Sequence, residues 1–140
     1  MRALGLDLGS RRIGVALSDS AGTVATPYEV ITRAGDRAGD HGRIAALVDE
    51  TGAAIVVVGL PRSLDGGIGP AARDALAEIE ELRSRLPVEV VAWDERLSTV
   101  EAARRLRAAG VKTHKGRRVV DQVAATVILQ SWLDACQPRG

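Results

Sequence analysis

The sequence predicts an α/β domain built on a mixed β-sheet with helices on both faces. Three strand-like segments open the chain, and helical and strand-like segments alternate after them. An antiparallel meander followed by such alternation is typical of a mixed sheet. A run of five apolar residues, 54–58, indicates a strand that is covered on both faces. The 140 residues, of which 46% are hydrophobic and 26% charged, suit a single domain with its own core.

The first three elements are predicted to be strands. Residues 2–8 and 13–19 are expected to pair across a short glycine-led turn, 9–12. A third strand is expected within 24–31, where Pro27 places it at the edge of the sheet or beside a bulge.

The middle of the chain alternates between helix and strand. Residues 33–42 are polar and glycine-rich, so they are predicted to form a loop that contains His41. A helix is expected over 42–50, with apolar residues at i, i+3 and i+4, and the strand 54–58 follows it. A loop over 59–69 leads to the next helix.

Pro70 can begin that helix, and Leu76, Ile79 and Leu82 form its inward stripe before Pro87 ends it. Residues 88–93 are the fifth predicted strand.

The last part of the chain is predicted to be helical apart from one basic loop. Residues 98–101 have the S-x-x-E form of a capping box, so a helix should begin there and end at Gly110. A basic loop, 110–118, contains His114 and leads to a final helix over 121–134. Trp93 and Trp132 fall in apolar elements and are expected in the core.

The positive charge of the chain is concentrated in one segment, 96–120. The net charge of the whole chain is +1, but this segment carries +7 and the remainder carries −6. Such a segment attracts a polyanion and releases its counterions on binding, although runs of charge are often only solvated surface. We predict nucleic-acid contacts from six of its residues: Arg104, Arg107, Lys112, Lys115, Arg117 and Arg118.

Acidic residues occur at three positions where burial is expected. Asp7 lies in an apolar strand beside small residues, where an unpaired carboxylate costs several kcal/mol. Asp94 and Glu95 follow directly after the fifth strand, at the strand end where α/β sheets place their sites. Asp121 lies on the helix face that also carries Ala125, Ile128 and Trp132.

Each acid also has a structural explanation. Asp7 could accept hydrogen bonds from the 9–12 turn, Glu95 could pair with Arg96, and Asp121 could cap the last helix. Together the three suit Mg²⁺ or Mn²⁺ rather than zinc, because hard cations prefer oxygen ligands. Two such ions can promote in-line attack on a phosphodiester, so the residues predict metal-dependent phosphoryl chemistry. The glycine-rich segment 59–70 could cradle a phosphate at a helix N-terminus or be a plain turn.

Four linked motifs resemble the YqgF/RuvX family, in order and over nearly the whole chain. They are GLDLGSRRIGVA at residues 5–16, VGLP at 58–61 with DG at 65–66, DERLST at 94–99, and DQVAA at 121–125 followed by ILQ at 128–130. The resemblance implies a ribonuclease H-like fold, with a mixed five-stranded sheet over a single nuclease domain, residues 1–140. It also implies metal-dependent endonuclease activity with Asp7, Glu95 and Asp121 as the catalytic and metal-binding acids. RuvC resolvases show a further acid near the last one, and here that region reads Gln122, Val123 and Ala124.

The resemblance implies two substrates, the 5′ end of precursor 16S rRNA and the Holliday junction. We expect the first and keep the second as the alternative, together with a catalytically idle nucleic-acid-binding module. A junction resolvase should be a homodimer, whereas an RNA-processing enzyme can be a monomer.

The composition also predicts where the protein resides. No apolar run approaches the roughly 20 residues that cross a bilayer, so we expect neither a membrane protein nor an exported one. The one cysteine, Cys136, cannot form an internal disulfide and suits a reducing cytoplasm.

Overall fold

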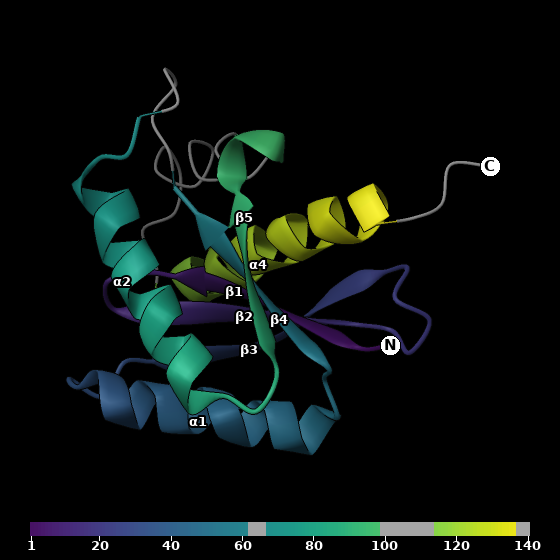
Figure 1. The fold of residues 1–140 in the computed structure, drawn as a ribbon, viewed down its shortest axis with the longest axis horizontal. Helices are drawn as coiled ribbons and strands as arrows, with labels where there is room; N and C mark the ends of the chain where they lie inside the picture. The colour runs from purple at the N-terminus through teal and green to yellow at the C-terminus, as the bar shows by residue number, and fades with distance from the viewer. Residues whose placement is uncertain (62–66, 99–113, 137–140) are drawn as a thin grey trace.

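The computed structural model describes residues 1–61, 67–98 and 114–136, and its centre is a five-stranded mixed sheet (Figure 1). The strands lie in the order β3-β2-β1-β4-β5, with β1, β2 and β3 antiparallel and β4 and β5 parallel to β1. The helices α1 and α2 cover one face and α4 covers the other, so the predicted fold class is confirmed. The elements are β1 Ala3–Leu8, β2 Arg12–Ser18, β3 Ala25–Thr32, α1 Arg37–Thr51, β4 Ile55–Leu60, α2 Pro70–Arg85, β5 Glu89–Asp94, the 3₁₀ helix η1 Glu95–Leu97, and α4 His114–Cys136.

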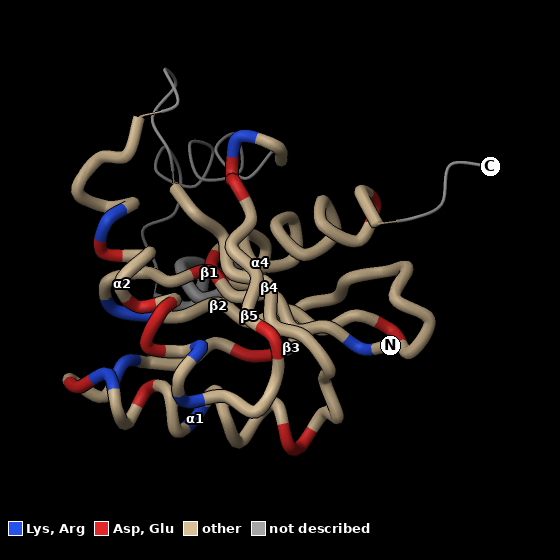
Figure 2. Tube along the Cα trace, in the orientation of Figure 1, with Lys and Arg blue, Asp and Glu red and all other residues tan. Residues whose placement is uncertain are grey.

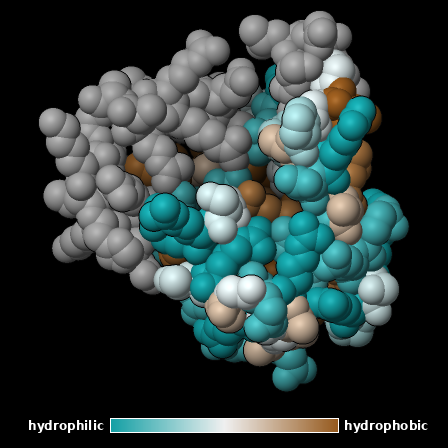
Figure 3. All heavy atoms as spheres, turned by 90° about the vertical axis from the view of Figure 1, so that its left-hand side faces the viewer, coloured by the Kyte–Doolittle hydropathy of each residue, from teal (hydrophilic) through white to brown (hydrophobic). Residues whose placement is uncertain are grey.

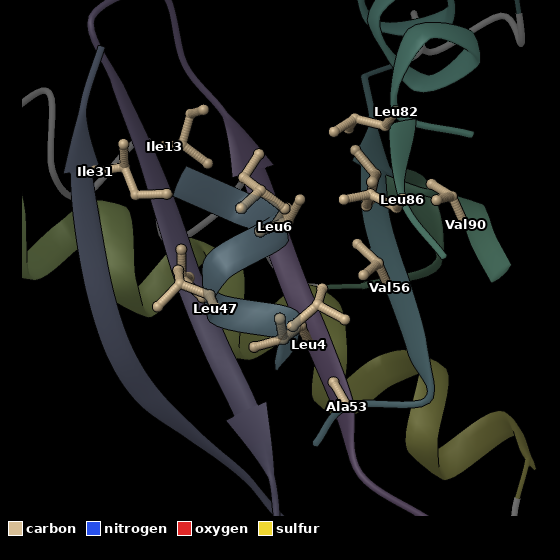
Figure 4. Close-up of a cluster of buried hydrophobic side chains, with 14 of the residues drawn as sticks. Leu4, Leu6, Ile13, Ile31, Leu47, Ala53, Val56, Leu82, Leu86 and Val90 are labelled. Carbon is tan, nitrogen blue, oxygen red and sulfur yellow. The ribbon is translucent and has the colours of Figure 1, made fainter. Parts of the chain in front are cut away.

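The central strand β1 divides the core into two layers. Leu4 and Leu6 are fully buried on the side of α1 and α2, where large aliphatic side chains fill the space between sheet and helices (Figure 4). Ala3 lies in the other layer, beneath α4. The sheet residues of that second layer are mostly small, so α4 can approach the strands closely; they are Ala3, Ala16, Ala25, Ile55 and Val57.

The third strand confirms both expectations for Pro27. β3 is the outer strand of the sheet, where a missing backbone N–H is tolerated. Its pairing with β2 also shifts register, since Val15 pairs with Glu29 while Ala16 pairs with Pro27. The edge position and the bulge therefore occur together.

The loop predicted over 33–42 is wrong from Arg37 onward, because α1 begins there. The side chain of Asp36 accepts a hydrogen bond from the Gly39 backbone N–H and so caps the helix. Two glycines at positions 39 and 42 suggested a loop, but the cap and the burial of Asp40 and His41 against the protein outweigh their low helix propensity.

The basic loop predicted over 110–118 is also wrong from His114 onward. α4 begins at His114, seven residues before Asp121, because Lys and Arg are good helix formers. The helix predicted over 98–110 lies outside the described residues from Thr99 onward.

The loop predicted over 59–69 begins two residues later than expected. Gly59 pairs with Trp93 and Leu60 pairs with Asp94, so β5 extends the ladder of β4 beyond the apolar run. Pairing with a neighbouring strand outweighs the low strand propensity of glycine here. Of the helices that the structure describes, none is both long and apolar enough to span a bilayer.

Two glycine-to-alanine substitutions are expected to have opposite effects on stability, one at the contact between α4 and β2 and one on the surface of α1. A Cβ at Gly14 would lie 2.0 Å from the backbone carbonyl oxygen of Asp121, so Gly14→Ala must push α4 off the sheet. We expect it to cost at least about 1–3 kcal/mol of unfolding free energy, as overpacking does. Gly42→Ala, on the exposed side of α1 with nothing within 4 Å, should stabilise by up to about 1 kcal/mol.

Urea unfolding of the two variants measures both effects. A Gly14→Ala protein as stable as the wild type would contradict the close approach of α4 to β2.

Candidate active site

Asp7 lies near the end of the central strand and is only 6% exposed. Its partner across the antiparallel ladder is Gly14 of β2. On the other side, β1 and β4 pair up to Leu6 and Val58, and the same register continued by one residue places Gly59 beside Asp7. Neighbouring residues in adjacent strands share a face of the sheet, so Asp7 points to the α4 side between two glycines.

Asp121 lies above the first of these glycines. The backbone oxygen of Asp121 would be 2.0 Å from a Cβ at Gly14, and Asp121 is 8% exposed. It shares the inward face of α4 with Ala125 and Ile128, as predicted, and both are fully buried. Because α4 begins seven residues earlier, the alternative that Asp121 caps the helix is wrong.

Glu95 lies above the second glycine. Its Oε1 would be 3.1 Å from a Cβ at Gly59, and the residue is 4% exposed. Asp94, by contrast, accepts a hydrogen bond from the Arg96 backbone N–H and pairs with the Arg96 guanidinium, with 2.6 Å from Nη2 to Oδ2. The chain therefore turns Glu95, rather than Asp94, toward the sheet beside Asp7.

The three predicted acids are thus brought to neighbouring positions on one face of the sheet. All their ligand atoms would be carboxylate oxygens, which fit a hard divalent cation in chemistry and charge. Among the described residues, no three His, Cys, Asp or Glu side chains already form a metal-binding group. Asp121 faces a cation of the protein itself, because Arg12 Nε lies 2.6 Å from its Oδ2.

The turn between β1 and β2 forms the rim of this region. The Gly9 N–H donates to the Arg12 carbonyl oxygen over 3.0 Å, which closes the turn. Three surface hollows, of about 440, 380 and 180 Å³, share Ser10 in their walls. In the part of this side that the structure describes, hydrophilic side chains dominate the surface (Figure 3).

Arg33, just beyond β3, holds the turn from behind. Its Nε donates to the Gly9 carbonyl oxygen over 2.7 Å, and its backbone N–H donates to Arg11 over 2.9 Å. Its guanidinium also donates to both carboxylate oxygens of Glu78 at 2.9 Å and to Asp40 at 3.1 Å. One arginine therefore joins the β1–β2 turn to α1 and α2, whose charged residues mark this end of the molecule in Figure 2.

His41 extends this network and corrects a prediction. It is not in a polar loop but 1% exposed inside α1, with Nε2 2.8 Å from Glu78 and Nδ1 3.0 Å from Arg85. Burial by itself would raise the pKa of Glu78, but hydrogen bonds from Arg33 and His41 together with the charge of Arg33 hold it below its usual value. The carboxylates likewise raise the pKa of Arg33 above its already high value against the opposing effect of burial.

Sequence reasoning missed this network although one signal was present. Glu78 lies within the apolar stripe of α2, between Ala75 and Leu82, where a charged residue requires a buried partner. The partner could not be identified from the sequence, because Arg33 is 45 positions away.

The predicted nucleic-acid contacts lie outside what the structure describes. Arg104, Arg107 and Lys112 fall within 99–113, and the side chains of the other three, Lys115, Arg117 and Arg118, are not described although their backbone forms the start of α4. Residues 62–66 of the glycine-rich segment are also outside the described residues, so its role remains a prediction.

The tryptophan prediction is confirmed in part, because both side chains are partly buried at the edge of the core. Trp93 and Trp132 pack against the core layer beneath α4, and the Trp93 indole N–H donates to Ser131 Oγ over 3.0 Å.

The chain is similar in sequence to a known protein family and to named bacterial proteins. The profile of the family described as "RuvX: Holliday junction resolvase" matches residues 1–135. A protein of Mycolicibacterium paratuberculosis is 54% identical over 135 residues, which are 95% of this chain and 80% of that protein. One of Mycobacterium ulcerans is 52% identical over 95% of this chain and 78% of its own. Both carry the name "Putative pre-16S rRNA nuclease".

The fold is similar to that of two solved structures. RuvC of Thermus thermophilus superposes with a TM-score of 0.57 at 15% identity, covering 96% of this chain and 95% of that one. RuvC of the same organism in complex with a Holliday junction substrate gives 0.55 at 16% identity over 96% and 94%. At such low identity the likeness concerns the fold alone, and it confirms the ribonuclease H-like fold.

The network around Arg33 predicts how stability depends on acid. Because the pKa of Glu78 is lowered in the folded protein, its contribution to stability is fully present above its ordinary pKa of about 4.3. It is lost as the pH falls from there through the lower pKa of the folded state. Glu78→Gln should cost about 1–3 kcal/mol at pH 7, since it removes one of the two carboxylates that neutralise the partly buried Arg33 and leaves Asp40 as the other. The variant should also lose less additional stability than the wild type between pH 6 and pH 3.5.

Thermal melts across this pH range test the prediction, with Glu80→Gln as the matched control on the exposed side of α2. The control should change stability by less than about 1 kcal/mol, because exposed ion pairs contribute little. Equal pH profiles for wild type and Glu78→Gln would show that Glu78 is not charged in the folded protein.

Proposed function

Because the chain belongs to the RuvX family of nucleases, we propose that it is a metal-dependent endonuclease acting on the 5′ end of precursor 16S rRNA. In this proposal residues 1–140 form one nuclease domain, which hydrolyses phosphodiester bonds of structured nucleic acid in the cytoplasm. The observation that supports it most is the placement of three buried acids on one face of the sheet, with Asp121 and Glu95 above the two glycines that flank Asp7. The name of relatives more than 50% identical over nearly the whole chain supports the RNA substrate.

Asp7, Glu95 and Asp121 would hold Mg²⁺ or Mn²⁺. When bound, such ions lower the pKa of water and stabilise the leaving oxygen of a phosphodiester. Asp7 is held rigidly in the central strand, whereas Glu95 and Asp121 come from separate elements above its neighbours. The three therefore act as one unit only when α4 and η1 are both packed on the sheet.

The protein must also offset the repulsion between three carboxylates and a polyanionic substrate. Arg12 supplies positive charge beside Asp121, and the basic residues of segment 96–120 would hold the phosphate backbone. Contacts of that kind position a substrate without reading its sequence.

The second candidate substrate is the Holliday junction, which the family description and the RuvC fold both favour. Cleaving a junction requires two equivalent sites, so that function calls for a two-fold homodimer, whereas a monomer is sufficient for RNA processing.

The experiment is a cleavage assay with Asp7→Asn, using precursor 16S rRNA and a four-way DNA junction side by side with Mg²⁺ or Mn²⁺. The substitution removes a charge and almost no volume, so the wild type should cleave the RNA while the variant loses at least about 100-fold in rate and keeps its fold. Cleavage of the junction alone, by a dimer, would establish the second candidate. Binding without cleavage by the wild type would establish a catalytically idle module.

The same cleavage assay on further variants tests the roles of Glu95 and Asp121 against that of the neighbouring Asp94. Glu95→Gln and Asp121→Asn should be as inactive as Asp7→Asn, and the losses should not add, because the three act as a unit. Asp94→Asn is the control, since Asp94 is paired with Arg96. An active Glu95→Gln together with an inactive Asp94→Asn would reverse the assignment.

The proposed path of the nucleic acid predicts a change in salt dependence. Reversing Arg104 and Arg107 to Glu should weaken binding of every substrate and flatten log K against log salt by about 0.7–0.9 per lost contact. Filter binding between 50 and 300 mM salt measures the slope, and the melting temperature should stay nearly constant. An unchanged slope with a large fall in melting temperature would show a structural role for both arginines.

A further inference from the structure

Arg12 is a positively charged residue that lies against Asp121, one of the proposed metal ligands. Its Nε is 2.6 Å from Asp121 Oδ2, and only 17% and 12% of the two side chains are exposed. The pair joins residues 109 positions apart, at the start of β2 and within α4. It therefore lies inside the candidate active site rather than on the outer surface.

The position of this pair is determined by the sheet. Arg12 and Gly14 are two positions apart along β2 and so point to the same face, on which α4 packs. Because Asp121 rests directly on Gly14, its carboxylate stays within reach of Arg12. Arg12 lines a hollow of about 180 Å³ together with Gly9, Ser10, Arg11 and Asp121.

Three buried carboxylates on one face of a sheet repel one another, and a nearby cation lowers that cost. A guanidinium and a divalent cation would both serve this purpose at Asp121. The guanidinium and the divalent cation compete for the same carboxylate oxygen, so the binding of one weakens the binding of the other.

We propose that Arg12 is a positioning residue. It pairs with Asp121 Oδ2 in the metal-free protein and is displaced from that oxygen when a divalent cation binds. The released guanidinium then faces the hollow at the β1–β2 turn, where it meets a phosphate of the substrate. This inference rests on the proposed metal-dependent function. It gives the protein a stable metal-free state at the expense of metal affinity.

The test is the affinity for Mn²⁺, measured by isothermal titration calorimetry on the full chain without nucleic acid. Arg12→Gln removes the competing cation and should bind Mn²⁺ about three- to tenfold more tightly than the wild type, as expected for loss of one partly buried ion pair. Arg11→Gln is the matched control, since it removes the same charge from an exposed neighbouring residue and leaves the pair intact. It should change the affinity less than about twofold.

A second readout separates competition from a structural role. In EDTA, Arg12→Gln should melt below the wild type, and saturating Mn²⁺ should close that gap, because the metal then replaces the guanidinium at Asp121. A merely structural arginine would leave the same gap in both conditions.

The outcomes are distinguishable from failure of the proposed function. If the wild type binds Mn²⁺ and Asp121→Asn does not, but Arg12→Gln binds no more tightly than the wild type, the competition is overturned and the metal site stands. An equal gain for Arg11→Gln also overturns it, in favour of a general charge effect. If neither the wild type nor Arg12→Gln binds Mn²⁺, the metal-dependent function fails and the inference fails with it.

Discussion

The close approach of α4 to the sheet is the contact on which both the core and the candidate site depend. At Gly14 the helix backbone itself occupies the space where a side chain would stand, since Asp121 O lies 2.0 Å from the Cβ position. At Gly59 the helix contributes Ile128, whose Cδ1 would be 2.5 Å from a Cβ. A larger residue at Gly14 would lift the helix and move Asp121 away from Asp7, whereas one at Gly59 would first displace the end of the Ile128 side chain. The packing that buries the apolar layer beneath α4 is therefore the same packing that assembles the acids.

The charges around this contact are balanced by arginines of two different kinds. Arg33 is structural, because it joins Gly9 to α1 and α2 and gives buried Glu78 its ionic partner. Arg12 lies on the opposite face of the same turn and pairs with Asp121. The turn between β1 and β2 is thus held from behind by a permanent network and carries an exchangeable ion pair in front. This arrangement places a rigid support directly beneath the end of the strand that carries Asp7.

Sequence reasoning succeeded where the information was local. Alternation along β1, the apolar run of β4 and the position of Pro27 identified the strands and the edge, and motif spacing identified the family and its fold. It failed where distant residues decide local structure. The polar, glycine-rich stretch around His41 predicts a loop, but α1 reaches back to Arg37 and buries His41 against Glu78. The basic stretch before Asp121 predicts a loop by its charge, but its Lys and Arg residues favour a helix, and α4 begins at His114.

The amino-acid order alone determined the class of sheet and the helical faces, and it predicted acidic residues at three places with the chemistry that suits a hard cation. These follow from periodicity and residue type, which act over a few positions, whereas the choice of Glu95 over Asp94 follows from the resemblance to the family motif. Only the tertiary structure decided that Glu95 and Asp121 lie above the two glycines beside Asp7, and that Asp121 meets Arg12. The reason is that each of these neighbours is brought in by a different element, across separations of up to 109 residues. Strand register and helix packing, which set such contacts, depend on the whole folded chain.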